Sequence, residues 1–338
     1  MAEKDYILEV EDLKTRFRVG RRTINAVNGV NFKLRRGKTL CVVGESGCGK
    51  SVTAHSVMQL LPSNGGIAGG RVIYRPDADT SLELSAMKRS SKDIRKIRGK
   101  DIAMIFQDPM STLNPVYTVG SQITEMLCHH EKLDKNVARA RGIQMLADLG
   151  IPNPEERFDQ YPHEFSGGMK QRVMIAIAMI CNPHILIADE PTTALDVTIQ
   201  AQILDLIRKM QEQHGTSVIL ITHNMGIVAE IADDVAVMYM GRVVEFGSLE
   251  QIFTNPTHPY TKALMRSVPV LGMNKEQELA TIDGTTPDAS TKFTGCEFAD
   301  RCTCAKPECS CRFPVDTTVE EGHIVRCLMF EEGEKHAE

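Results

Sequence analysis

The sequence has no long apolar run, and this absence bears on where the protein works. Its longest uninterrupted apolar stretch, residues 173–181, is far shorter than the roughly 20 residues that a membrane-spanning helix needs. The N-terminal stretch MAEKDYILEVEDLK lacks the basic segment followed by an apolar segment that is typical of a signal peptide. We therefore expect a cytoplasmic protein that reaches a membrane only through a partner.

A long block of lysine and arginine is also missing, and the formal net charge is −5. Duplex nucleic acid is bound mainly through neutralisation of its phosphates, so this charge pattern argues against a nucleic-acid partner. The sequence shows no internal repeat and no low-complexity segment. With 338 residues and 42% hydrophobic residues, it can bury a large core and predicts two domains, or one large domain with an extension.

Cysteines are unevenly distributed along the chain. Six of the ten fall between Cys296 and Cys327, and in a cytosolic protein such thiols are buried side chains or ligands of a metal or cluster more often than disulfides. After about Phe253 the composition shifts toward proline, threonine, glycine and cysteine. We expect a domain boundary there, with residues 1–253 before it and 254–338 after it.

The order of apolar segments predicts an α/β fold. Alternating apolar residues over 6–34, with a polar turn at 20–22, indicate strands of a mixed sheet. A buried strand, 39–43, leads through a glycine loop to a helix over 50–61, and helical spacing over 119–149 predicts a helical insert at about 115–165. Alternation of strands and helices indicates a parallel sheet. The remaining strands are expected at 102–106, 185–188, 218–221, 235–240 and 242–245, with a helix at 197–213.

The loop after strand 39–43 fits the pattern G-x-x-x-x-G-K-[ST] between a strand and a helix, as that pattern requires. Its glycines let backbone N–H groups surround phosphates, Lys50 would neutralise the β and γ phosphates, and Ser51 would bind Mg²⁺. A chance glycine turn of this form is expected on the order of once in a hundred chains of this length. The predicted ATP-binding residues here are Gly44, Glu45, Ser46, Gly47, Cys48, Gly49, Lys50 and Ser51.

Two carboxylates, Asp189 and Glu190, end the apolar strand at 185–188. Ligands of open α/β sheets bind at the carboxyl ends of the strands. Asp189 is suited to hold Mg²⁺ through water, and Glu190 to polarise the water that attacks the γ phosphate. Without the upstream loop, an ordinary acidic turn after a core strand would be a plausible alternative for the pair.

Further motifs resemble the ABC ATPase family. They are Ser166-Gly167-Gly168 before a helix, Gln107 after a strand, Ala194-Leu195-Asp196, and His223 after the strand at 218–221. The resemblance implies a P-loop ABC ATPase core with a RecA-like parallel sheet, a β-rich edge and a helical insert. It also implies a head-to-tail dimer, in which Ser166, Gly167 and Gly168 contact the γ phosphate held by the opposite subunit.

The same resemblance implies roles for single residues. Gln107 would link Mg²⁺ to the helical insert, Asp196 would act at the dimer seam, and His223 would hydrogen-bond the γ phosphate. Phe17 is expected to stack on adenine, with a core phenylalanine as the alternative. The motif around Ser166 departs from the commonest family form, with Phe165 in place of leucine and Met169 in place of glutamine.

Three longer strings, residues 105–115, 161–172 and 255–264, resemble ATP-binding subunits of dipeptide, oligopeptide and nickel importers. The cysteine-bearing tail favours peptides over nickel. The resemblance implies a second ABC ATPase subunit, two transmembrane permeases and an extracytoplasmic peptide-binding protein, with this chain peripheral on the cytoplasmic face of the cell membrane. A DNA-repair ATPase would carry long insertions between its nucleotide motifs, whereas only a modest helical stretch separates Ser51 from Asp189.

Four cysteines of the tail, Cys296, Cys302, Cys309 and Cys327, resemble the C-terminal module of peptide-importer ATPases, some of which hold an iron-sulfur cluster. Four thiolates suit a 4Fe-4S cluster or a tetrahedral zinc ion. The lack of a tight C-x2-C pair favours the cluster. Disulfides and free thiols remain as alternatives, and Cys304 and Cys311 are extra residues without an assigned role.

Overall fold

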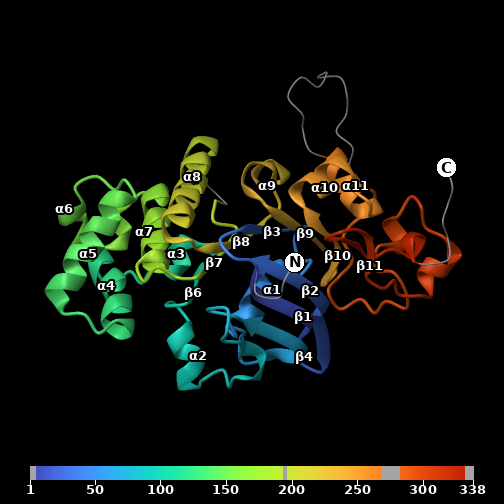
Figure 1. Ribbon diagram of the computed structural model, residues 1–338, viewed down its shortest axis with the longest axis horizontal. Helices are drawn as coiled ribbons and strands as arrows, with labels where there is room; N and C mark the ends of the chain where they lie inside the picture. The colour runs from blue at the N-terminus through green and yellow to red at the C-terminus, as the bar shows by residue number, and fades with distance from the viewer. Residues whose placement is uncertain (1–4, 193–195, 268–281, 332–338) are drawn as a thin grey trace.

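The computed structural model describes residues 5–192, 196–267 and 282–331, and a central sheet organises them (Figure 1). Its strand order is β11-β12-β10-β9-β3-β8-β7-β6, and the pairings among β9, β3, β8, β7 and β6 are parallel. The bounds of these parallel strands are Thr39–Val43 (β3), Ile102–Ile105 (β6), Ile185–Asp189 (β7), Ser217–Thr222 (β8) and Asp234–Tyr239 (β9).

Every residue of the five parallel strands is buried. Strands that are covered on both faces have continuous apolar sequences. A short apolar run in the sequence is therefore enough to predict each of these strands. Helices cover one face: α7 (Gly167–Met179), α8 (Val197–His214) and α9 (Met225–Ile231), while α1 (Lys50–Val57) lies toward the second sheet. The expected α/β core with a parallel sheet is confirmed.

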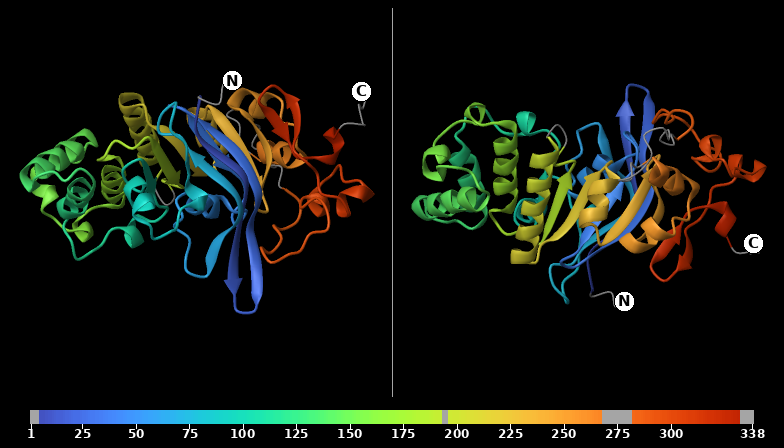
Figure 2. Two further views of the ribbon diagram at one scale, coloured as in Figure 1. Left: turned by 60° about the horizontal axis from the view of Figure 1, so that its bottom comes forward. Right: turned by 90° about the horizontal axis from the view of Figure 1, so that it is seen from above.

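A second sheet, with the order β2-β1-β4-β5, packs beside the central one (Figure 2). All of its pairings are antiparallel, so the strands predicted over 6–34 are present but the expected mixed sheet is wrong for this part. The short turn at residues 20–21 explains the difference, because such a turn can join only antiparallel strands. The bounds are Tyr6–Val19 (β1), Arg22–Arg35 (β2), Gly65–Tyr74 (β4) and Leu82–Glu83 (β5), followed by η2 (Leu84–Ala86) and α2 (Lys92–Ile97).

The helix after the glycine loop ends earlier than expected. Instead of reaching residue 61, α1 stops at Val57, and Gln59 adopts a left-handed backbone with φ of 49°. The Gln59 side-chain amide donates to the carbonyl of Met87 at 2.8 Å and to that of Leu84. These contacts with a distant segment fix the turn, and they are not visible in the local sequence.

The helical insert lies at the opposite end of the molecule from the cysteine-bearing tail (Figure 1). Its two longest helices begin with side-chain caps, because Thr118 accepts from the N–H of Ser121 at 3.2 Å and Asp134 from that of Asn136 at 2.9 Å. Phe158 packs so closely that any side chain at Gly120 would clash with its ring. The helices of this region are α3 (Pro109–Thr112), α4 (Val119–His130), α5 (Lys135–Asp148), α6 (Pro154–Phe158) and η3 (Pro162–Glu164).

Residues after the predicted boundary extend the central sheet. Strand β10 (Arg242–Ser248) pairs antiparallel with β9, and β12 (His323–Val325) and β11 (Thr317–Glu320) continue the sheet beyond it. The expected boundary at 253 falls inside α10 (Leu249–Thr254), and the division into 1–253 and 254–338 stays a prediction. Parts of the tail, 268–281 and 332–338, lie outside the described residues. Its other elements are α11 (Pro259–Arg266), η4 (Ala299–Arg301), η5 (Pro307–Ser310) and η6 (Leu328–Phe330).

Within the described residues, the helices are all too short or too polar to cross a membrane.

Candidate functional site

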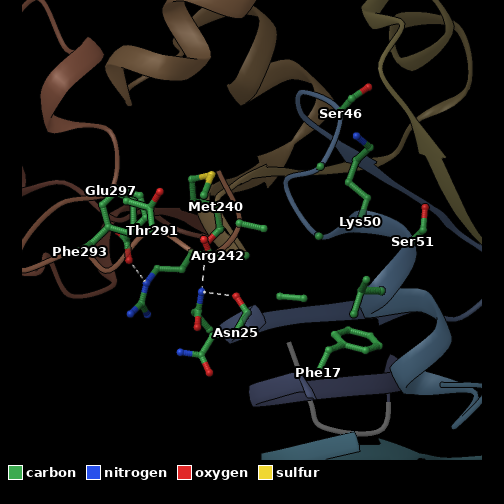
Figure 3. A pocket seen from close by; sticks show the side chains of 18 of the residues that line it. Phe17, Asn25, Ser46, Lys50, Ser51, Met240, Arg242, Thr291, Phe293 and Glu297 are labelled. Carbon is green, nitrogen blue, oxygen red and sulfur yellow. Dashed lines mark hydrogen bonds and ion pairs between the residues drawn. The ribbon is translucent and has the colours of Figure 1, made fainter. Parts of the chain in front are cut away.

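The glycine loop borders a cleft of about 800 Å³ at the carboxyl end of β3 (Figure 3). Gly44, Gly47 and Gly49 have positive φ angles of 149°, 82° and 102°. A side chain at Gly44 would clash with the backbone of Met238, and one at Gly49 with the backbone of Ala26. Glycine is therefore required both for the curl of the loop and for its close approach to neighbouring backbone.

Lys50 follows the loop and its ammonium group folds back onto it. The Nζ atom donates to the carbonyl of Gly44 at 2.7 Å and to that of Glu45 at 3.0 Å. Cys48 is buried beneath the loop, and burial raises the pKa of its thiol. The loop therefore presents Ser46, Gly47, Gly49, Lys50 and Ser51 to the cleft, while Gly44, Glu45 and Cys48 support it.

Ser51, in the first turn of α1, meets Asp189, the last residue of β7. The Ser51 hydroxyl donates to Asp189 Oδ1 at 2.9 Å. Burial raises the pKa of Asp189, and the Ser51 hydrogen bond opposes this effect only in part. A buried carboxylate beside a hydroxyl is a suitable ligand pair for Mg²⁺, whose charge would offset the burial.

Glu190 contacts two other residues that the sequence predicted for the site. Gln107 Nε2 donates to one carboxylate oxygen at 3.0 Å, and His223 Nδ1 lies 3.3 Å from the other. Its backbone has a left-handed φ of 45°, a conformation that costs roughly 1–3 kcal/mol for a residue other than glycine and is common at functional sites. The N–H of Glu190 donates to the carbonyl of Ile221 at 3.0 Å, which holds this backbone in place.

The wall facing the loop contains residues that the sequence motifs did not indicate. Phe17 lines the cleft, its ring lies against Gly65, and its stacking on adenine stays a prediction. Opposite, the Arg242 guanidinium pairs with Glu297 and lies 5.5 Å from the centre of the Phe313 ring. The other lining residues of this wall include Asn25, Met240, Ala289, Ser290, Thr291, Lys292 and Phe293 (Figure 3). Most of them belong to the tail, for which no nucleotide motif exists.

Ser166 and Asp196 are not among the residues that line the cleft. Each caps a helix, because Ser166 Oγ accepts from the N–H of Met169 at 3.3 Å and Asp196 Oδ1 from that of Ile199 at 3.0 Å. Both are exposed, as is Gly167, and Gly168 is half-buried. Ala194 and Leu195 lie outside the described residues. A single chain therefore does not bring Ser166 and Asp196 to its own glycine loop, residues 44–51, which is called the phosphate loop from here on.

The four predicted cluster cysteines line one small cavity of about 20 Å³ together with Cys304. Burial raises the pKa of Cys296 to about 12 and that of Cys327 to about 11. As placed, the thiols enclose room for about one water, and no three His, Cys, Asp or Glu side chains of the described residues are grouped to hold a metal ion. Cys311 does not line this cavity, and its thiol donates to the Glu308 carbonyl at 3.4 Å. The cluster stays a prediction.

The string at residues 255–264 has a structural role that its sequence did not reveal. The buried Glu245 carboxylate accepts from the N–H groups of Thr257 at 2.6 Å and His258 at 2.9 Å. The Nδ1 atom of His258 accepts from the N–H of Tyr260 at 3.0 Å, and the Tyr260 hydroxyl accepts from the N–H of Glu45 at 2.9 Å. This chain of contacts connects the tail to the phosphate loop.

Comparison with known families agrees with this geometry. Residues 27–193 match the ABC transporter family, and residues 244–309 match the C-terminal region of oligopeptide/dipeptide transporters. The dipeptide transport ATP-binding protein DppD of Bacillus subtilis is 49% identical over 332 residues, which cover 98% of this chain and 97% of that protein. The chain belongs to the ABC transporter family of ATP-binding subunits. Its activity is therefore that of an ABC ATPase.

A second relative and two solved structures extend the comparison. The oligopeptide transport ATP-binding protein OppD of Bacillus subtilis is 50% identical over 296 residues, covering 87% of this chain and 81% of that protein. CbiO1 of Clostridium perfringens, part of an ABC transporter complex, matches with a TM-score of 0.60 at 29% identity, over 74% of this chain and 92% of that one. A dimeric ATP-binding cassette bound to ADP and phosphate matches with a TM-score of 0.63 at 24% identity, over 72% and 98%, and supports the P-loop fold alone.

Proposed function

We propose that this ABC ATPase powers the import of dipeptides or oligopeptides. The observation that carries the proposal is the match of residues 244–309 to the oligopeptide/dipeptide transporter C-terminal region, joined in one chain to an ABC cassette. The relatives from Bacillus subtilis, named for dipeptide and oligopeptide transport, support the same substrate class. Nickel import and a role outside transport are the other outcomes of the test below.

The proposal includes an assembly. The chain would lie on the cytoplasmic face of the cell membrane, paired with a second ABC ATPase and docked on two transmembrane permeases. The groove near Gln107 and the helical insert is the expected docking surface, since exposed Gln107 contacts Glu190 directly and could report permease contact to the hydrolytic site. An extracytoplasmic peptide-binding protein would deliver the substrate, and nucleic acid has no part in the assembly.

Reconstitution tests this assembly. The chain is co-expressed with the two permeases and the ATPase encoded beside its gene, and the complex is inserted into lipid vesicles. We expect the ATPase rate to rise when the neighbouring binding protein is added with a dipeptide or oligopeptide mixture. A response to Ni²⁺ with no response to peptides would assign the nickel branch, and no association with permeases would contradict the importer proposal. A complex carrying Glu190→Gln controls for contaminating ATPases.

The residues of the cleft would have separate roles in ATP binding and hydrolysis. The loop N–H groups and Lys50 would bind the phosphates, for which the Lys50 ammonium must exchange its bonds to loop carbonyls for phosphate oxygens. Ser51, Asp189 and Gln107 would hold Mg²⁺, which neutralises developing charge on the phosphates when bound. Glu190, assisted by His223, would orient the attacking water, and Phe17 would stack on adenine.

A second subunit would complete the site. Ser166 caps the N-terminus of α7, and its neighbour Gly167 has open space around it, so this helix start can approach an anion closely. Helix N-termini bind phosphate through unpaired N–H groups and the helix dipole. We infer that Ser166, Gly167 and Gly168 contact the γ phosphate on the opposite subunit, with Asp196 at the seam. A hydrolysis rate that rises with the square of the chain concentration at low concentration would support this pairing.

The tail is proposed to hold a 4Fe-4S cluster on Cys296, Cys302, Cys309 and Cys327. These four thiols surround a common cavity whose other walls include Phe298, Leu328 and Met329. A cluster holds its thiolates further apart than a single zinc ion does, because each binds a different iron. Side-chain rotation would have to enlarge the cavity. A bound cluster would supply structural anchoring here, since ATP hydrolysis needs no electron transfer.

Metal analysis tests the cluster separately from transport. Protein purified without oxygen is expected to be brown and to carry about four irons per chain. Cys302→Ser should lose colour and iron, whereas Cys311→Ser, which changes a cysteine outside the cavity, should keep both. About one zinc per chain without iron would assign a zinc site, and neither metal would contradict both versions.

A further inference from the structure

Arg301 of the tail holds the side chain of Glu45, the second residue of the phosphate loop. Its Nη1 atom lies 2.7 Å from Glu45 Oε2, and its Nη2 atom lies 3.0 Å from Oε1, so the guanidinium binds both carboxylate oxygens. The arginine side chain is 5% exposed and the glutamate 25%. A bidentate pair with this little exposure fixes both position and orientation, unlike most ion pairs on a protein surface.

Other residues hold the same two side chains. Arg301 Nε donates to the carbonyl of Asp283 at 2.9 Å, and the Thr286 hydroxyl donates to Glu45 Oε2 at 3.1 Å. The Tyr260 hydroxyl accepts from the N–H of Glu45 at 2.9 Å. The backbone and the side chain of Glu45 are thus both held by residues that follow the ABC cassette in sequence.

This pair affects the phosphates through charge and through backbone position. The carbonyl of Glu45 is one of the two backbone carbonyls that accept from the Lys50 ammonium, so a shift of Glu45 also moves Lys50. An unpaired Glu45 carboxylate would add a negative charge beside the site of an anionic triphosphate and would compete with it for Lys50. Arg301 neutralises the carboxylate and occupies both of its oxygens.

We propose that Arg301 is a positioning residue for the phosphate loop, through which the tail sets the affinity for ATP. This inference rests on the proposed phosphate-binding role of the loop. Arg301 need not touch the nucleotide, because its effect passes through Glu45. The competing explanation is that the ion pair only attaches the tail to the cassette.

A double-mutant cycle separates the two explanations. The dissociation constant of MgATP is measured by calorimetry on the full chain with Glu190→Gln, which prevents turnover, and with Arg301→Gln, Glu45→Gln or both added. We expect Arg301→Gln to weaken binding by roughly tenfold to a hundredfold. The double variant should regain most of this loss, because no unpaired carboxylate remains. Arg301→Lys keeps the positive charge but loses the bidentate geometry of the guanidinium. Its affinity for MgATP should lie between those of the parent and of Arg301→Gln.

Control variants make each outcome decisive. Arg312 pairs with Glu331 elsewhere in the tail, so Arg312→Gln should bind MgATP within twofold of the parent. Lys50→Ala reports on the phosphate site itself, and unchanged affinity in that variant would overturn both the site and this inference. If Lys50→Ala weakens binding while Arg301→Gln and Arg301→Lys do not, only the positioning role is wrong. If Arg301→Gln and the double variant lose the same affinity for MgATP, the unpaired Glu45 carboxylate is not the cause of the loss. Arg301 would then serve only to attach the tail.

Discussion

The Glu245 carboxylate accepts a hydrogen bond from the backbone N–H of His258 at 2.9 Å, in a region closed to solvent. It also accepts from the N–H of Thr257 at 2.6 Å and lies 2.8 Å from His323 Nε2. One side chain of β10 thus joins the start of α11 to strand β12. The sequence string at 255–264, which resembles peptide-importer ATPases, is held in place by this acceptor.

We expect Glu245→Gln to lower the free energy of unfolding by about 3 kcal/mol, because the amide brings a donor to a place where three donors meet. Urea titration at neutral pH measures the change. Glu250→Gln, on the exposed face of α10, is the matched control and should change stability by less than about 0.5 kcal/mol. Equal stabilities of the two variants would show that the buried acceptor contributes little.

The sequence predicted the elements whose pattern is local. Continuous apolar segments identified β3, β7, β8 and β9, and the loop at residues 44–51 was recognisable because its glycines, lysine and serine must be adjacent. Strand ends of a parallel sheet then bring Gln107 and His223 to Glu190, so those contacts followed from the fold.

Contacts between distant segments could not be predicted in this way. Arg301 and Glu45 are 256 positions apart, and neither residue type is unusual where it stands. The tail wall of the cleft, with Glu297 and Phe313, depends on the contacts of both residues with Arg242 of β10. Such contacts depend on how side chains fit together across the whole molecule. The periodicity of apolar residues, which predicts local helices and strands, carries no information about them.

The antiparallel sheet contains a buried carboxylate that makes stability depend on pH. Glu9 pairs with Lys33 at 2.8 Å and with Arg75. Burial acts to raise the pKa of Glu9, but its hydrogen bonds to the two cations outweigh burial and lower the pKa below its ordinary value of 4.5. The carboxylate therefore stabilises the fold above pH 4.5, and this contribution disappears as the pH falls through the lowered pKa.

Glu9→Gln should accordingly be less stable than the parent at pH 7, by about 2 kcal/mol, and the difference should shrink as the pH falls below 4.5. Thermal unfolding from pH 7 to pH 3 measures both effects. Glu11→Gln is the control, because Glu11 pairs with Arg71 at the surface, where their side chains are 41% and 58% exposed. A difference between parent and Glu9→Gln that stays constant over this range would contradict the assignment.

Lys50→Ala should weaken MgATP binding by at least about tenfold, because a cationic phosphate ligand is lost. Calorimetry on the isolated chain measures the affinity. Lys38→Ala provides a matched loss of one ammonium group: Lys38 pairs with Asp233 at 2.9 Å and precedes β3, at the end opposite the phosphate loop. Equal affinities of the Lys50 variant and the parent would show that the phosphates bind elsewhere.

Glu190→Gln tests the hydrolytic step alone. The substitution keeps the size of the side chain and an oxygen that can accept from Gln107, but it removes the carboxylate that would polarise water. We expect kcat to fall by roughly 10²-fold to 10⁴-fold, the usual contribution of a general base, while the affinity for MgATP stays within about threefold of the parent.

The same variant should change the assembly state. With hydrolysis blocked, ATP would stay bound between the Ser166–Gly168 motif of one subunit and the phosphate loop of the other if the proposed pairing holds, so an ATP-bound dimer should accumulate. Size-exclusion chromatography with light scattering, with and without MgATP, measures it. Glu230→Gln, at an exposed position of α9, should hydrolyse ATP at the parent rate and form no persistent dimer. A Glu190→Gln protein that turns over at nearly the parent rate in the assembled transporter would place the base elsewhere, and the contacts of Gln107 and His223 with Glu190 would then be structural.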